Sequence, residues 1–197
     1  MRLLLIAPPG AGKGTQGERL AARSGVRHIA AGDLLRAQAR AGGRLGREIA
    51  ACQDRGDLVP DQIVLDVLTP AVTEAAARGG YILDGFPRSL SQATAAAQLA
   101  ARLGVALEAA VYLYAPEAVL TQRLLDRARQ SGRADDTAAV IRHRLGVFTE
   151  MTGPLVRYYT ERRILVAVNA DQPPDSVTAD IIQRRARLSC SSHPPSP

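Results

Sequence analysis

The chain has 197 residues, 46% of them hydrophobic, so it is long enough for one globular domain with a sizeable core. Its formal net charge is +6, which is typical of a solvated arginine-rich surface or of a protein with a phosphate-bearing partner. A nucleic-acid partner is not expected, because no basic stretch is interleaved with aromatic residues. Two distant cysteines, Cys52 and Cys190, argue against a disulfide framework or a zinc site and favour a cytoplasmic protein.

The first apolar run, residues 3–6, leads directly into a glycine-rich turn. This run is too short for the hydrophobic part of a signal peptide, and no other stretch of the sequence reaches membrane-spanning length. We therefore expect it to be a buried strand, and we expect no membrane partner.

Five short apolar runs predict strands, and most are nearly continuous, as in parallel strands that are covered on both faces. They span residues 2–7, 28–30, 81–84, 109–114 and 164–169. Helical stretches lie between them, at residues 16–24, 61–78, 92–103, from 116 onward, from about 137 onward and at 176–187. This alternation predicts an α/β fold with a doubly wound, five-stranded parallel sheet in a single domain, residues 1–188.

Several residues mark where these helices begin, bend or end. Asp61 is a candidate N-cap, and Pro70 is expected to kink the helix that follows it. The pair at 153–154, Gly-Pro, predicts a break in the helix that starts near residue 137. Pro116 suits a first turn, behind which three leucines should face inward: Leu120, Leu124 and Leu125.

Three segments depart from the alternation of strands and helices. Residues 31–60 are polar and helical without a strand, which predicts a small lobe over the sheet edge. Residues 128–136 form a charged stretch between helices, a candidate lid in which Asp135 and Asp136 either hold arginines or cap the next helix. Residues 189–197 are rich in serine and proline and are expected to be a disordered tail.

The sequence holds a single lysine, Lys13, in a glycine-rich turn after the first predicted strand. Residues 8–15 read Pro-Pro-Gly-Ala-Gly-Lys-Gly-Thr, and they depart from the general phosphate-loop pattern at two positions, Ala7 and Gly14. Such a turn can wrap an oxyanion in backbone N–H groups while the ammonium reaches the outer phosphates of a nucleotide. A structural turn between strand and helix is the alternative interpretation.

Asp84 ends the third predicted strand, where a carboxylate can hold the water shell of Mg²⁺ beside the phosphates. The alternative is a buried carboxylate that is satisfied by hydrogen bonds. Asp33 is a second candidate for the Mg²⁺ waters, and an N-cap role fits it equally well. Arg88 follows the sharp turn after Asp84 and can contact a phosphate through two N–H groups.

Four stretches together resemble an adenylate kinase of the short-lid form. They are residues 8–16, Gly-Asp-Leu-Leu-Arg at 32–36, Asp-Gly-Phe-Pro-Arg at 84–88 and Ser-Gly-Arg-Ala-Asp-Asp at 131–136. The resemblance extends to about Val177 and implies the phosphate-loop nucleoside monophosphate kinase fold, with Mg²⁺ as cofactor. It also implies a monomeric enzyme that catalyses the reversible reaction of ATP with AMP to give two ADP.

The resemblance implies roles for the residues at matching positions. ATP would be bound by Gly10, Ala11, Gly12, Lys13, Gly14, Thr15, Arg123, Arg127 and Gln172. AMP would be bound by Ala31, Arg36, Asp57, Leu58, Val59, Gly85, Phe86, Pro87, Arg88, Gln92, Arg133 and Arg144. Catalysis would rest on Lys13, Arg88, Arg123, Arg133 and Arg144, and Asp84 and Asp33 would hold Mg²⁺ through water. For any single arginine, a solvated surface charge is the alternative.

Two positions give opposite indications about the acceptor nucleotide. Gln92 carries an amide that suits the adenine edge, as in adenylate kinases. Ala31 replaces the threonine that is usual in adenylate kinases and is similar to uridylate/cytidylate kinases. We favour AMP, because two directional hydrogen bonds discriminate more than one lost hydroxyl, and a UMP/CMP kinase is the alternative.

No catalytic base is expected, because the acceptor is already a phosphate oxygen and phosphoryl transfer depends on alignment and charge neutralisation. The three histidines, His28, His143 and His193, therefore receive no catalytic role. A hypothesis from a different functional class is that the chain is a catalytically weakened paralogue that binds nucleotide or nucleic acid. It is motivated by the basic composition and by Ala7.

Overall fold

The computed structural model describes residues 1–55, 59–131 and 138–191. Five parallel strands form one sheet in the order β2-β3-β1-β4-β5. Their bounds are β1 Arg2–Ile6, β2 Arg27–Ala30, β3 Tyr81–Asp84, β4 Ala109–Tyr114 and β5 Leu165–Asn169. This confirms the α/β fold with a five-stranded parallel sheet that the spacing of the apolar runs predicts.

The helices follow the strands in the alternation that the sequence predicts. They are α1 Lys13–Ser24, α2 Ala31–Ala41, α3 Gly43–Arg55, α4 Asp61–Ala77, α5 Leu90–Arg102, α6 Glu117–Ser131, α7 Ala138–Glu161 and α8 Pro174–Ser191. None of the helices in the described residues is long and apolar enough to cross a membrane. Residues 31–55 are helical apart from the turn between α2 and α3, as expected for that segment.

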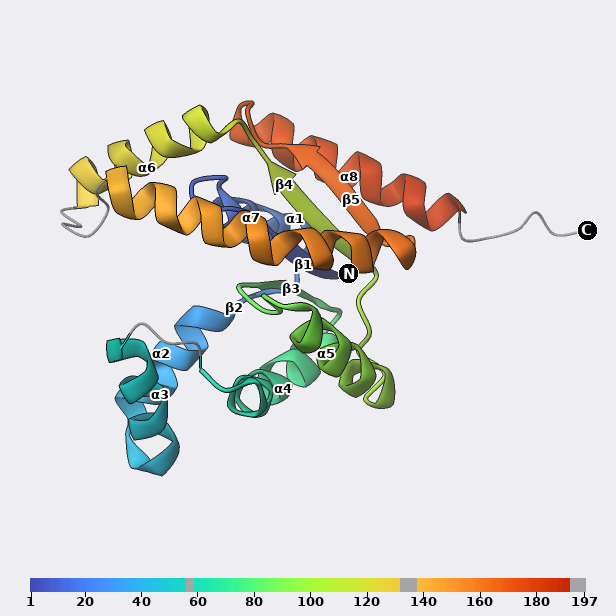
Figure 1. The fold of residues 1–197 in the computed structure, drawn as a ribbon. Coiled ribbons are helices and arrows are strands. Elements are labelled where there is room, and N and C mark those ends of the chain that lie inside the picture. The colour runs from blue at the N-terminus through green and yellow to red at the C-terminus, as the bar shows by residue number, and fades with distance from the viewer. Residues whose placement is uncertain (56–58, 132–137, 192–197) are drawn as a thin grey trace, which may run out of the picture.

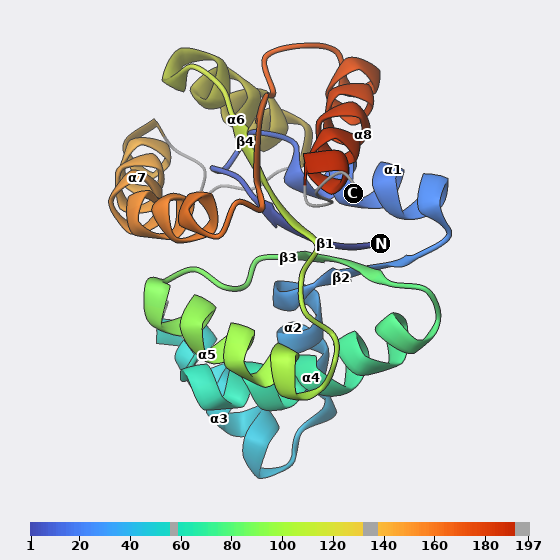
Figure 2. The same cartoon turned by 90° about the vertical axis from the view of Figure 1, so that its right-hand side faces the viewer.

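The sheet separates two hydrophobic layers, and successive residues of β1 contribute to opposite ones. Leu3 and Leu5 belong to the layer with α1, α6 and α8, whereas Leu4 and Ile6 belong to the layer with α4 and α5. This is the twofold alternation of a strand covered on both faces. Figures 1 and 2 show α1, α6 and α8 on one side of the sheet and α2 to α5 on the other.

The predicted break at residues 153–154 is wrong, because α7 continues through Pro154 to Glu161. A proline inside a helix removes one backbone hydrogen bond, but the packing of both halves of α7 offsets that loss. Ile141 in the first half is buried in the α1, α6 and α8 layer. Tyr158 in the second half is buried in the α4 and α5 layer.

Other helix ends differ from their predictions by a few residues. Residues 128–131, expected in the lid, are the last turn of α6, and 189–191, expected in the tail, extend α8. No proline or glycine interrupts the chain there until residues 132 and 194, so each helix can propagate. Pro116 precedes α6, and its carbonyl accepts the N–H of Val119 and of Leu120.

The two proposed aspartate caps are also wrong. The N-cap of α4 is Pro60, and Asp61 is its first helical residue. The N-cap of α2 is Ala30, and Asp33 lies in the first turn, where a negative charge still suits the helix dipole. Both carboxylates are therefore available for side-chain partners.

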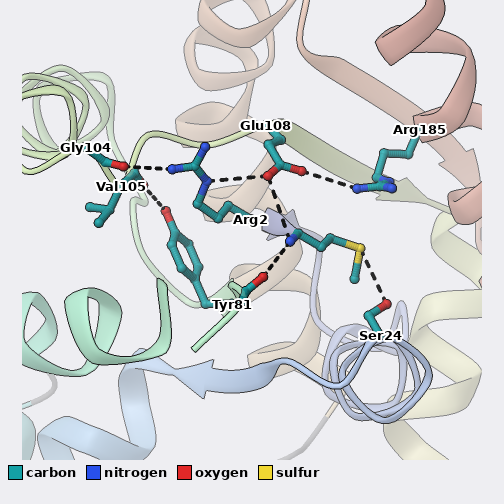
Figure 3. A network of polar contacts seen from close by, with 9 residues as sticks. Arg2, Ser24, Tyr81, Gly104, Val105, Glu108 and Arg185 are labelled. Carbon is teal, nitrogen blue, oxygen red and sulfur yellow. Dashed lines mark hydrogen bonds and ion pairs between the residues drawn. The ribbon is translucent and has the colours of Figure 1, made fainter. Parts of the chain in front are cut away.

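A polar network ties the amino ends of β1 and β3 to the neighbouring loops (Figure 3). Glu108 lies 3.5 Å from Arg2 Nε and accepts a hydrogen bond from Arg185 Nη1 at 3.3 Å. The Tyr81 hydroxyl donates to the carbonyl of Val105 at 2.7 Å. Burial of Tyr81 raises its pKa to about 12, so the hydroxyl keeps its proton at neutral pH. This network lies away from the carboxyl ends of the strands, where open parallel sheets bind ligands.

Candidate active site

The glycine-rich turn joins β1 to α1 at the carboxyl edge of the sheet. Gly10 and Gly12 have φ angles of 84° and 81°, which favour glycine. A Cβ on Gly10 would lie 2.8 Å from the carbonyl oxygen of Leu120, so this glycine permits close packing on α6. A Cβ on Gly12 would meet nothing within 4 Å. The two glycines thus have different roles, one in packing and one in the turn at the start of α1.

Ala7 occupies the position where the general pattern has a glycine, and the backbone explains why alanine fits. Within the described residues, Arg163 is the one non-glycine residue with a positive φ, so Ala7 has an ordinary backbone conformation. Its side chain is 7% exposed and packs in the α1, α6 and α8 layer together with that of Ala11. The departure at Ala7 therefore leaves the shape of the turn intact.

Lys13 is the first residue of α1, and its ammonium faces the end of β3. Lys13 Nζ lies 3.6 Å from Asp84 Oδ1, and His28 Nε2 lies 2.8 Å from Asp84 Oδ2. Burial alone would raise the pKa of Asp84, but the hydrogen bond from His28 and the charge of Lys13 outweigh it and lower that pKa. Burial lowers the pKa of Lys13 despite its partner Asp84, and the positive charge of Arg88 adds to this effect.

His28 received no role from the sequence, yet the fold places it against Asp84. Its ring lies over Gly17, where a Cβ would stand only 2.4 Å from His28 Nε2. Glycine in the middle of a helix costs roughly 1 kcal/mol relative to alanine, and here it makes room for the imidazole. Gly17, in the interior of α1, is the feature of the sequence that could have indicated a close neighbour. Spacing along the chain does not identify that neighbour as His28 of β2.

A cleft of about 850 Å³ opens above the glycine-rich turn, a volume that suits a nucleotide. Ten of the predicted site residues line it: Gly10, Gly12, Lys13, Gly14, Thr15, Gly85, Pro87, Arg88, Arg123 and Arg127. The i, i+4 spacing of Arg123 and Arg127 on α6 brings both to this cleft, as their spacing predicts. The cleft thus collects cations from three separate segments of the chain.

The opposite wall of the cleft comes from α7, of which the sequence analysis assigned only Arg144 to the site. His143, Val147, Phe148, Met151 and Thr152 line it, at the three- and four-residue intervals of one helix face. That face combines three apolar residues with the polar His143 and Thr152, so its hydrophobic periodicity does not distinguish a ligand wall from a core face. Only the packing of α7 against α6 and β5 reveals it.

The segment after β5 lies beside one of these arginines. Arg123 Nη1 donates to the carbonyl of Ala170 at 2.9 Å. Gln172 turns back on its own segment, with Nε2 donating to the carbonyl of Asn169 at 2.8 Å and to Asp180 Oδ2 at 3.0 Å. The expected contact of Gln172 with ATP would therefore fall to its backbone rather than to its side-chain amide.

On the acceptor side, several of the expected AMP residues have partners within the protein. The Arg36 guanidinium pairs with Asp33, and Arg88 Nε donates to the carbonyl of Gly85 at 2.8 Å. Gln92 donates to Asp61 and accepts from the backbone N–H of Arg88. The side chains of three others are buried in the α4 and α5 layer rather than in the cleft: Ala31, Val59 and Phe86.

Some expected site residues lie outside the part of the chain that the structure describes. They are Asp57, Leu58 and Arg133, together with Asp135 and Asp136 of the expected lid. Arg144 lies within α7, but its side chain is outside the described set. The roles of these residues stay predictions.

The described residues contain no group of three or more metal-ligating side chains. The Thr15 hydroxyl lines the cleft, and the Asp84 carboxylate lies 3.6 Å from Lys13 Nζ, which also lines it; both are oxygen groups of the kind that Mg²⁺ prefers. Such a sparse donor set suits a Mg²⁺ ion that is bound mainly by phosphate oxygens and water. These residues therefore fit the cofactor that the family resemblance implies.

A second cavity, of about 220 Å³, lies between α4, α5 and the end of α7. Its lining is apolar apart from a few groups, and it includes Leu68, Phe86, Ala96 and Tyr158. It shares only Pro87 with the larger cleft. Because it lacks a cluster of cations, this cavity does not suit a polyphosphate.

Comparison with known proteins identifies the family. The adenylate kinase family model matches residues 5–164. The adenylate kinase of Stenotrophomonas maltophilia (strain R551-3) is 42% identical over 182 residues, which cover 92% of this chain and 97% of that protein. The enzymes of the same name from Thermobifida fusca (strain YX) and Synechococcus sp. (strain WH7803) are 43% and 45% identical, and each match covers 90% of this chain and 94% of the relative. The chain therefore belongs to the adenylate kinase family and is a phosphotransferase.

Proposed function

We propose that this enzyme reversibly transfers the γ-phosphoryl group of ATP to AMP and that the cleft above the glycine-rich turn is its active site. The observation that carries the proposal is the convergence of Lys13, Arg88, Arg123 and Arg127 on one cleft at the carboxyl edge of the sheet. The family match supports the same reaction. A UMP/CMP kinase, suggested by Ala31, is not favoured by these relatives.

The described residues suit a mechanism of alignment and charge neutralisation. Lys13 would contact the outer phosphates of ATP, while Arg123 and Arg127 would bind the same chain of phosphates from α6. Arg88 would hold the acceptor phosphate, since its Nε is fixed by Gly85 and its terminal nitrogens stay available for a two-pronged contact. Gly10, Ala11, Gly12, Gly14 and Thr15 would enclose the phosphates by their backbone.

Mg²⁺ would be held at this cleft through water by Asp84, with Asp33 as a second contributor. When bound, Mg²⁺ neutralises charge that develops on the phosphate oxygens. The chain itself supplies a carboxylate that the hydrogen bond from His28 keeps ionised and oriented. No proton needs to be removed from the acceptor, since it is a phosphate oxygen.

On the acceptor side, we assign the adenine contact to Gln92 and the phosphate contact to Arg36 and Arg88. Ala31, Asp57, Leu58, Val59, Gly85, Phe86 and Pro87 would form the pocket around the nucleotide. Arg133 and Arg144 would approach the transferred phosphoryl from the lid side, and the backbone near Gln172 would face the adenine of ATP. We further propose that the enzyme acts as a cytoplasmic monomer, which light scattering after gel filtration would check.

A panel of acceptors tests the proposed function. The purified protein is assayed with MgATP and each of AMP, UMP, CMP and GMP, and the initial rate of ADP formation is measured. We expect the highest kcat/KM with AMP. A higher kcat/KM with UMP or CMP would contradict the assignment of the acceptor, and salt-dependent duplex binding without any turnover would favour the weakened paralogue instead.

A further inference from the structure

The side-chain amide of Gln92 is held between two fixed partners. Gln92 lies in the first turn of α5 and is only 5% exposed. Its Nε2 donates to Asp61 Oδ1 at 2.7 Å, and its Oε1 accepts from the backbone N–H of Arg88 at 2.7 Å. The first partner belongs to α4 and the second to the loop between β3 and α5, so the amide bridges two elements.

These partners permit only one orientation of the amide. A backbone N–H can only donate, and an ionised carboxylate can only accept. If the amide rotated by half a turn, its NH₂ group would face the N–H of Arg88 and its oxygen would face the carboxylate of Asp61. Both contacts would become repulsive, and buried polar groups would lose their partners. The orientation therefore follows from the chemistry of Arg88 and Asp61.

The two hydrogen bonds leave half of the amide's capacity unused. A carboxamide has two lone pairs on oxygen and two N–H donors, and each partner takes one of them. One acceptor and one donor therefore remain, in a fixed order along the edge of the amide. That pair complements a base edge with an amino donor beside a ring-nitrogen acceptor, as in adenine. A 6-oxopurine has the reverse order, with a carbonyl acceptor beside an N–H donor.

We propose that Asp61 is a specificity-determining residue that selects a 6-aminopurine monophosphate over a 6-oxopurine monophosphate by locking the Gln92 amide. Asp61 acts through Gln92 and is a positioning residue. The inference rests on the proposed contact between Gln92 and the acceptor base. The same lock favours CMP over UMP among weaker acceptors, because cytosine presents its donor and acceptor in the order of adenine.

The test compares AMP with IMP. These nucleotides differ only at the 6-amino or 6-oxo group and the adjacent ring nitrogen, the groups that a fixed Gln92 amide would distinguish. In Asp61→Asn, the new amide can donate or accept, so only the backbone N–H of Arg88 still opposes the rotated orientation of the Gln92 amide. We expect the ratio of kcat/KM for AMP to that for IMP to fall by about tenfold or more, mainly through faster turnover of IMP. Asp61→Ala, which removes the partner, should change the ratio in the same direction. Calorimetric Kd values for AMP and IMP should follow the ratio.

The matched control is Asp66→Asn on the same helix. Asp66 Oδ1 accepts from Gln62 Nε2 at 2.8 Å in an exposed pair of the same kind, and neither residue lines the cleft. This variant should keep the wild-type ratio. Equal losses of AMP and IMP turnover in the Asp61 variants, or an unchanged ratio, would overturn the inference and show that Asp61 is merely structural.

The outcomes also separate this inference from the proposed function. If the wild-type protein does not favour AMP among the acceptors, the proposed function fails before any variant is made. If the wild-type protein favours AMP and the Asp61 variants keep the wild-type ratio, only the lock fails.

Discussion

The region proposed to bind ATP, called here the donor side, and the region proposed to bind AMP, the acceptor side, are built in different ways. On the donor side, backbone and core set the geometry: Gly10 packs closely on α6, and Lys13 faces a carboxylate at the end of β3. On the acceptor side, polar side chains pair with one another, as in the contacts of Arg36 with Asp33 and of Gln92 with Asp61.

The difference indicates where binding requires rearrangement. The donor side has its shape before nucleotide arrives, because changing it would disturb buried packing. On the acceptor side, the proposed phosphate contact of Arg36 would replace its present contact with Asp33, so the net gain would be the difference between two contacts. Variants on the donor side should therefore affect catalysis or folding strongly, and variants on the acceptor side should mostly tune affinity and selectivity.

The largest effect is expected for Lys13→Arg on the donor side. A planar guanidinium cannot replace a compact ammonium inside the turn, so kcat should fall by about 100-fold or more. The midpoint of thermal unfolding should change little. The control is Arg27→Lys, an exposed pair with Glu74 at 3.2 Å outside the cleft. A near-normal kcat for Lys13→Arg would contradict the role of the lysine.

Gly10→Ala should show that the donor side depends on packing. The positive φ and the 2.8 Å approach to the Leu120 carbonyl should together lower the free energy of unfolding by about 2 kcal/mol. Gly14→Ala is the matched variant, because Gly14 is helical and nothing lies within 4 Å of its Cβ position. That variant should keep its stability in a urea titration. Equal stabilities of the two variants would show that the turn is not held by α6.

His28→Ala should weaken the support of Asp84. Loss of the 2.8 Å hydrogen bond should lower the free energy of unfolding by about 1–2 kcal/mol and kcat by less than Lys13→Arg does. Gly17→Ala should have a similar effect, because its Cβ would displace the His28 ring. His28→Gln, which can still donate, should recover most of the loss. If Gly17→Ala has the wild-type free energy of unfolding and kcat, displacement of the His28 ring does not weaken the support of Asp84.

The pH dependence of stability gives a second measure of the same contact. The pKa of Asp84 is lower in the folded protein than its usual value of 3.8, because His28 and Lys13 outweigh the effect of burial. Such a carboxylate stabilises the fold above the unfolded-state pKa, and its contribution is lost as the pH falls through the folded-state pKa. His28→Ala raises that folded-state pKa, so acid unfolding, followed by circular dichroism, should begin at a higher pH.

The smallest effect is expected for Asp33→Asn on the acceptor side. Its ion pair with Arg36 is exposed, and such pairs contribute about 0–1 kcal/mol. Release of Arg36 should therefore lower the KM for AMP by at most about fivefold. More Mg²⁺ should be needed for half-maximal activity, since Asp33 is also proposed to hold the metal's waters. An unchanged KM would show that the pair does not compete with the acceptor phosphate.

Local patterns in the sequence predict a large part of this molecule. The apolar runs at residues 81–84 and 109–114 are strands with the predicted bounds. Short, continuous runs of this kind are typical of parallel strands that are covered on both faces, and the glycine-rich turn after β1 is also a local pattern. Ten of the site residues that the family resemblance predicts line one cleft.

Several features could not be predicted, because in them the local preference of a residue competes with contacts that form only when the chain packs. Pro154 is a helix breaker by itself, but α7 is packed on both sides of it and continues. Asp61 suits an N-cap by its type, yet its carboxylate contacts Gln92 on another helix. The α7 wall of the cleft has no distinct pattern, since the residues that line it are a mixture of apolar and polar types.

The amino-acid sequence by itself determined the alternation of strands and helices, the glycine-rich turn around Lys13 and the family, because each is encoded over short spacings. Only the tertiary structure decided which distant groups meet. The order of the strands brings His28 to Asp84, and the packing of α4 near α5 brings Asp61 to Gln92. Periodicity specifies the conformation of a segment, whereas its partners follow from how the segments pack.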